Sequence, residues 1–230
     1  MLKLQKLLVI LAVGLFSQTA LAETFTVVSG SSQYKKGQVL SGKTKIKLKA
    51  GEKLVIKTVR TDKEYRYILK GPYSEDSKEK GLLETIIEII KPQKGGAANQ
   101  ANEQVKNPWL LIVSQDYNFC YHTNDSIKFW RAKAPKDAEI TIEGITTDKP
   151  FEEFWEADNH DFEVDVNKLP KVKKGGIYLA KIEGTFPITL HKMPSSLSSD
   201  TYKANWMFQK GCKRQGMLLL KEEKLLLTSK

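Results

Sequence analysis

The chain has 230 residues, of which 40% are hydrophobic and 28% are charged, and its formal net charge is +10. This is the composition of a globular protein with one large domain or two small ones. It excludes a chain that is disordered throughout, a collagen and a long coiled coil.

The first 22 residues have the three parts of a secretory signal peptide. Lys3 and Lys6 give a positive start, Leu7 to Phe16 form an apolar stretch, and Ala20-Leu21-Ala22 is a small-residue cleavage site. Ten apolar residues make a helix of only about 15 Å, which is too short to cross a bilayer. We therefore expect cleavage after Ala22, no transmembrane anchor in the mature chain, and a location in the bacterial periplasm or outside the cell.

Residues 23–75 have the pattern of a small β-rich module. Phe25 to Val28, Leu54 to Val59 and Tyr65 to Leu69 are expected strands, and glycines separate them at nearly regular intervals. Lys45-Ile46-Lys47-Leu48-Lys49 alternates strictly, which predicts a strand with one apolar face and one lysine face. The pattern predicts a meander that closes as a small sandwich or barrel.

This first module carries most of the positive charge, with twelve Lys and Arg against five Asp and Glu. A basic module of this size attracts polyanions such as lipopolysaccharide or teichoic acid; nucleic acid is not the partner that we expect. Lysines on an edge strand also protect it from aggregation, which is a purely structural reason for them. The candidate interaction residues are Lys43, Lys45, Lys47 and Lys49.

A helix and a linker follow, in residues 76–107. Apolar residues recur on one helical face of residues 79–91, and Pro92 ends the pattern. We expect this face to dock on a core, with a partner groove or a membrane surface as alternatives. The candidate contact residues are Leu82, Ile86 and Ile90. Residues 93–107 contain glycines and small polar residues without apolar periodicity, which indicates a flexible linker and a domain boundary.

Residues 108–230 predict a second β-rich module that ends in a helix. The expected strands include Trp109 to Val113, Ile127 to Arg131 and Glu139 to Glu143. Residues 199–227 are expected to be helical, with Ser199 or Asp200 as the N-cap.

The two cysteines, Cys120 and Cys212, both lie in this second module. An even number of cysteines in an oxidising compartment predicts a disulfide, which would attach the C-terminal helix to the strand of Cys120. A metal site with His122 as a third ligand is the alternative.

Catalytic motifs are the part that the sequence does not supply. Acidic residues crowd around His160 between residues 152 and 165, which suits a solvated face, a cation site, or paired carboxylates for acid–base catalysis. The sequence has no nucleophile elbow and no phosphate-binding loop. Aromatic residues lie next to a basic residue at Phe129-Trp130-Arg131, as in stacking platforms for sugars or bases. Core residues have the same pattern.

Two sets of motifs resemble known protein groups. The stretch from Gly37 to Tyr73, with Ala50-Gly51-Glu52 and Gly71-Pro72-Tyr73, resembles FecR-like β-rich periplasmic domains. Cys120 before Phe129-Trp130-Arg131, together with Gly211-Cys212-Lys213-Arg214-Gln215, is similar to a group of uncharacterised secreted proteobacterial proteins. The resemblance implies an envelope protein with a role in ligand sensing or assembly, and it implies no catalytic residues.

The sequence therefore predicts a mainly β, α+β fold with two small modules, a linker helix and a C-terminal helix held by a disulfide. We expect a non-enzymatic periplasmic or secreted binding protein that contacts an envelope protein, a polyanion or a glycan. The alternatives are a glycan hydrolase that uses the carboxylates near His160, and a dedicated polyanion binder. We expect neither a cofactor nor a metal.

Overall fold

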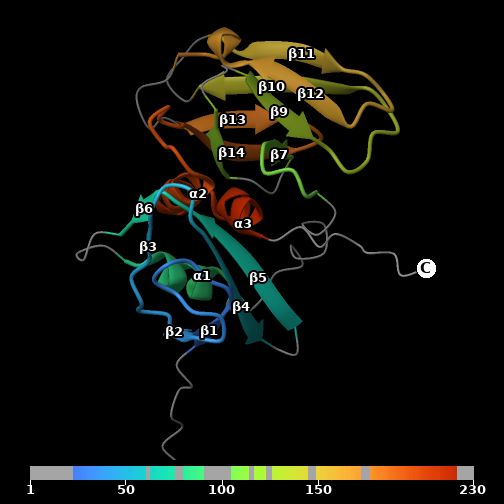
Figure 1. Ribbon diagram of the computed structural model, residues 1–230. Coiled ribbons are helices and arrows are strands. Elements are labelled where there is room, and N and C mark those ends of the chain that lie inside the picture. Colours follow the sequence, from blue (N-terminus) through green and yellow to red (C-terminus); the bar gives the residue numbers. More distant parts are fainter. Residues whose placement is uncertain are drawn as a thin grey trace, which may run out of the picture.

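Figure 1 shows the computed structural model of the chain. The structure is described for residues 23–60, 63–75, 80–90, 105–113, 117–122, 126–144, 149–171 and 177–221. The expected signal peptide and most of the expected linker lie outside these segments. The expected mainly β fold, with a disulfide to the C-terminal helical segment, is confirmed.

The first module is built on a four-stranded antiparallel sheet in the order β2-β1-β4-β5, so β2 and β5 form its two edges. A separate two-stranded ribbon pairs β3 with β6. The sheet is thus open rather than the closed sandwich or barrel that the meander pattern predicted. The strands are β1 (Thr24–Ser29), β2 (Val39–Ser41), β3 (Lys47–Leu48), β4 (Lys53–Arg60), β5 (Lys63–Lys70) and β6 (Tyr73–Ser74).

Helix α1 (Leu82–Ile90) covers the inner side of this module with the apolar face that its periodicity predicted. Leu82 and Ile86 are completely buried among the residues of the strands, and Ile90 is half-buried against the same core. The expectation that these residues offer a contact surface is therefore wrong for Leu82 and Ile86. Burying this apolar face against the sheet supplies the tertiary packing that a nine-residue helix needs.

A buried carboxylate holds the start of α1. Glu75 Oε1 accepts hydrogen bonds from the Leu82 backbone N–H at 3.0 Å and from the Tyr73 hydroxyl at 3.4 Å. Burial raises the pKa of Glu75 above its ordinary value of 4.5, although these hydrogen bonds and the charge of Lys45 act in the opposite direction.

We expect Glu75→Gln to be at least as stable as the wild type near neutral pH. The folded state holds the Glu75 proton more tightly than the unfolded chain does. Its stabilising contribution is therefore complete below pH 4.5 and is lost as the pH rises through the folded pKa. Glutamine keeps the acceptor for Leu82 and removes the buried charge. Urea denaturation near neutral pH and below pH 4.5 measures the difference, which should vanish in acid; an equal loss of stability at both pH values would contradict this account.

The second module is a sandwich of two sheets that enclose one apolar core (Figure 1). The larger sheet has the order β11-β10-β13-β14-β8 and the smaller has the order β12-β9-β7. Most neighbours are antiparallel, but β14–β8 and β7–β9 are parallel pairs. The strands are β7 (Leu110–Ile112), β8 (Asn118–Tyr121), β9 (Ser126–Trp130), β10 (Ala138–Gly144), β11 (Phe151–Trp155), β12 (Asp161–Asp165), β13 (Ile177–Lys181) and β14 (Thr185–Lys192), with the short helix η3 (Val166–Lys168) after β12.

A single helix was expected for residues 199–227, of which residues 222–227 lie outside the described segments. The described part forms two helices instead, α2 (Asp200–Gln209) and α3 (Lys213–Leu220). The predicted N-cap is confirmed, because Ser199 Oγ accepts a hydrogen bond from the Tyr202 backbone N–H. The break lies at Gly211, whose φ of 80° is in the left-handed region where glycine commonly ends a helix.

These two helices lie between the modules and pack into the core of the first (Figure 1). Ala204, Phe208 and Leu220 are buried there beside residues from the N-terminal strands and α1. The start of α2 is also hydrogen-bonded to the end of β5, where the Lys70 backbone N–H donates to Thr201 Oγ1 at 2.6 Å. The C-terminal helices, which follow the second module in sequence, thus complete the core of the first module.

Candidate functional site

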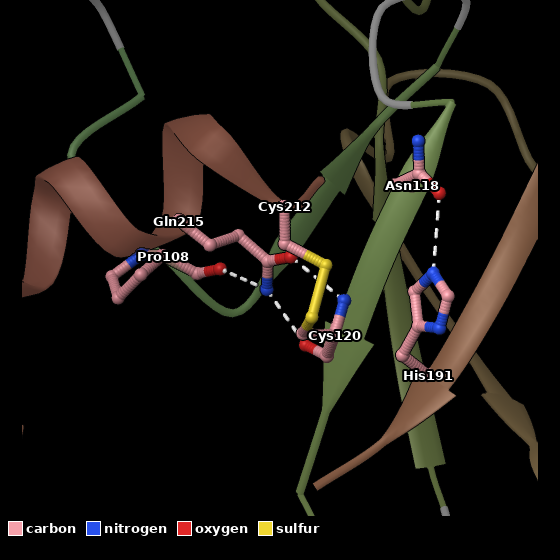
Figure 2. The surroundings of a disulfide bond; sticks show 6 residues. All are labelled: Pro108, Asn118, Cys120, His191, Cys212 and Gln215. Carbon is pink, nitrogen blue, oxygen red and sulfur yellow. Dashed lines mark hydrogen bonds between the residues drawn. A yellow bond between two sulfur atoms is a disulfide. The ribbon is translucent and has the colours of Figure 1, made fainter. Parts of the chain in front are cut away.

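The predicted disulfide joins β8 of the second module to the start of α3 (Figure 2). Cys120 and Cys212 are both buried, and their Cα atoms are 6.0 Å apart. Since α3 packs on the first module, this bond fastens the two modules to each other. The disulfide also removes the thiolates that the alternative metal site with His122 would require.

Gln215 completes this junction, and sequence reasoning did not find its role. The side chain is 1% exposed and forms two hydrogen bonds to the backbone of Cys120 (Figure 2). Its Oε1 accepts from the Cys120 N–H at 2.8 Å, and its Nε2 donates to the Cys120 carbonyl at 2.7 Å and to the Pro108 carbonyl at 2.8 Å. The amide therefore replaces a neighbouring strand at the outer edge of β8. The only sequence signal was the spacing of Gln215 three residues after Cys212.

We expect Gln215→Ala to lower the free energy of unfolding by about 1–3 kcal/mol, because it leaves the buried Cys120 N–H and carbonyl without their partner. Chemical denaturation measures the change. Asn107 is exposed, and its side-chain amide accepts a hydrogen bond from the nearby Trp109 backbone N–H, so Asn107→Ala offers a control amide. Equal effects of the two substitutions would contradict the role assigned to Gln215.

The four lysines of the expected lysine face lie on β3 and in the segment around it. Lys47 is on β3, Lys45 precedes this strand, Lys49 directly follows it, and Lys43 is in the turn after β2. Lys43, Lys47 and Lys49 are exposed and Lys45 is half-buried, whereas Ile46 and Leu48 between them are buried in the core. Among the described residues, Lys43, Lys47 and Lys49 form no ion pair.

Two side chains fix the backbone under these lysines. The Tyr34 hydroxyl accepts a hydrogen bond from the Lys47 N–H at 3.1 Å. Glu52 Oε2 accepts from the Lys49 N–H at 2.7 Å, and hydrogen bonds from Ser32 and from this N–H lower the pKa of Glu52. The backbone that bears these lysines is therefore held in place, with Ile46 and Leu48 buried in the core on its inner side.

The acidic residues near His160 are mainly on the outer face of a strand, as the sequence indicated. Asp161, Glu163 and Asp165 are exposed on β12, and Val164 points into the core. His160 donates a hydrogen bond from Nδ1 to the Arg131 carbonyl at 2.8 Å. This imidazole therefore has a structural partner at the end of β9.

Arg131 is a buried charged residue, which the sequence analysis placed at the end of a strand and in a possible stacking platform. Its guanidinium is 2% exposed and stacks over the Trp155 ring, 4.7 Å from the ring centroid. It donates to the carbonyl oxygens of Glu156 at 2.8 Å and Asn159 at 3.3 Å, and it pairs with Glu183 at 3.2 Å. The residue holds the turn between β11 and β12 against the rest of the sandwich.

Neither a metal site nor a membrane span is found in the part of the chain that the structure describes. There, no three His, Cys, Asp or Glu side chains gather in a way that could hold a metal ion. Within the same residues, no helix is long and apolar enough to cross a bilayer.

No family model, curated protein or solved structure matches this chain. The resemblance to FecR-like domains and to secreted proteobacterial proteins thus stays a prediction. What the structure adds is a physical role for the similar motif. Gly211 forms the helix break, Cys212 forms the disulfide, and Gln215 binds the backbone of Cys120.

Proposed function

We propose that this protein is a non-enzymatic binding protein of the bacterial envelope, periplasmic or secreted, that contacts an anionic envelope polymer through Lys43, Lys45, Lys47 and Lys49. The observation that carries the proposal is the exposure of Lys43, Lys47 and Lys49 along one short segment of the chain, in which Ile46 and Leu48 are buried in the core. Of the two contact surfaces expected from the sequence, the one on α1 is largely buried, and the lysine face remains.

Physical chemistry supports both parts of this proposal. Several exposed lysines close together produce a positive potential that attracts polyanions and speeds their association. A buried disulfide between distant parts of the chain is typical of proteins that fold in an oxidising compartment.

The test compares two variants with the same change of net charge. The first replaces the proposed contact residues as Lys43→Gln, Lys45→Gln, Lys47→Gln and Lys49→Gln. The control replaces four exposed lysines of the second module, as Lys133→Gln, Lys136→Gln, Lys149→Gln and Lys168→Gln. Binding to vesicles that contain lipopolysaccharide is measured by cosedimentation, with neutral vesicles as the blank.

We expect the first variant to bind at least about tenfold more weakly, since a lysine near an anionic surface contributes about 1 kcal/mol. The control variant should lose much less. If both variants lose binding equally, the effect depends on net charge and the lysine face is not the contact surface. If the wild type does not bind these vesicles more than neutral ones, an anionic envelope polymer of this type is not the partner.

A further inference from the structure

The second module has a surface groove that the proposed function does not use. It encloses about 240 Å³ and is lined by residues on or next to β8 of the larger sheet and β7, β9 and β12 of the smaller sheet. Its volume is somewhat below the roughly 300–1,000 Å³ of sites for drug-sized ligands, so it suits a ligand of one small ring. Six of its lining residues have aromatic or hydrogen-bonding side chains that a ligand could contact, and these are Trp109, Tyr121, His122, Ser126, Lys128 and Glu163.

Aromatic rings are among the groups that line the groove. The Trp109 indole and the His122 imidazole lie with their centroids 4.2 Å apart, and Tyr121, the last residue of β8, directly precedes His122. Trp109 and Tyr121 are half-buried, so parts of these rings face solvent. An amphipathic ring held in this way can cover the apolar C–H face of a ligand and leave its polar edge in water.

Hydrogen-bonding groups line the groove together with these rings. Glu163 on β12 is directly opposite Lys128 on β9, and Lys128 is in turn opposite Leu110 on β7. Glu163 can only accept hydrogen bonds and Lys128 can only donate them, while Ser126 can do both. The charges of Glu163 and Lys128 have opposite signs and are adjacent. Together these side chains offer directed polar contacts with little net charge.

We propose that this groove binds one neutral sugar ring of a glycan. A sugar ring has an apolar face of C–H groups and a rim of hydroxyls, each of which both donates and accepts hydrogen bonds. The apolar face of the sugar suits the rings of Trp109 and Tyr121. The hydroxyl rim suits the donor and acceptor pair of Lys128 and Glu163. An ionic ligand would instead meet one favourable and one unfavourable charge.

The state of His122 agrees with a neutral, hydroxyl-bearing ligand. Partial burial lowers the pKa of His122 below its ordinary value of 6.5, the nearby Lys203 lowers it further, and Asp200 acts in the opposite direction. The imidazole is therefore mainly uncharged at neutral pH, where one ring nitrogen donates and the other accepts.

The experiment titrates the full mature protein with three probes, N-acetylglucosamine, its β-1,4-linked disaccharide and maltose. Saturation-transfer NMR detects the bound sugar. Of the fluorescence of the four tryptophans, the change that is absent in Trp109→Ala reports on Trp109. Trp109→Ala should abolish binding. Because Trp109 also packs beside the disulfide, exposed residues provide the second test. Glu163→Gln and Lys128→Gln should each weaken binding about tenfold. Asp161→Asn, on the same face of β12 but outside the groove, should leave binding unchanged.

Saturable binding of at least one sugar, with this pattern of variants, supports the proposal. It is overturned if none of the three probes binds, if Glu163→Gln and Asp161→Asn have equal effects, or if adenosine binds where the sugars do not. The sugar affinity should change little with salt, whereas binding through the lysine face should fall steeply. Lipopolysaccharide binding is measured on the same samples. If lipopolysaccharide binds and the sugars do not, the groove proposal fails and the proposed function stands.

Discussion

Replacing Cys120 and Cys212 together with alanine should lower the free energy of unfolding by about 4–5 kcal/mol, the largest effect that we expect from any pair of side chains. The bond closes a loop of 92 residues, and cross-linking so long a loop removes much of the conformational entropy of the unfolded chain. The substitution should also loosen the contact between the modules, because β8 then retains Gln215 as its main partner on α3.

Guanidinium denaturation of the oxidised wild type, the reduced wild type and the double variant measures this effect. The reduced wild type and the double variant should agree within about 1 kcal/mol, because both lack the cross-link. A difference of less than about 1 kcal/mol between the oxidised wild type and the double variant would show that the bond does not constrain the unfolded chain as proposed.

Arg131→Ala should lower the free energy of unfolding by about 3–5 kcal/mol. The substitution leaves the carbonyl oxygens of Glu156 and Asn159 without a donor and removes the group that covers the Trp155 ring. Removing a buried guanidinium together with its several hydrogen bonds costs more than losing a single surface ion pair.

Glu183→Gln is the matched control for Arg131→Ala. The Glu183 side chain is 37% exposed, so its ion pair with Arg131 is screened by water and should contribute less than about 1 kcal/mol. Thermal and urea denaturation of the two variants separate the hydrogen bonds to the backbone from the ion pair. Equal losses would mean that Arg131 acts mainly through Glu183.

Alternation in the sequence predicted most of the strands because one face of each is in a core. Leu54 to Val59 and Glu139 to Glu143 are inside β4 and β10 as expected. Strand β11 was missed and treated as part of an acidic cluster. Its residues Phe151 and Trp155 are buried four positions apart, with exposed Glu152, Glu153 and Phe154 between them, so a period of two is not visible.

The parts of the candidate sites that sequence reasoning missed depend on partners far along the chain. Gln215 binds the backbone of Cys120, and Arg131 binds backbone carbonyls between residues 155 and 159. No local pattern marks a backbone group as the partner of a side chain. The break in the C-terminal helix is different, since Gly211 is a common helix-ending residue and could have been recognised.

The dependence of lipopolysaccharide binding on salt concentration tests the central claim most directly. If Lys43, Lys45, Lys47 and Lys49 contact an anionic polymer, the logarithm of the affinity should fall with the logarithm of salt concentration. The slope should be about 3–4, taking roughly 0.9 for each phosphate contact as on duplex DNA. Neutralising these four lysines should remove most of that slope. An affinity that does not change with salt, or a slope that survives in the variant, would contradict the account.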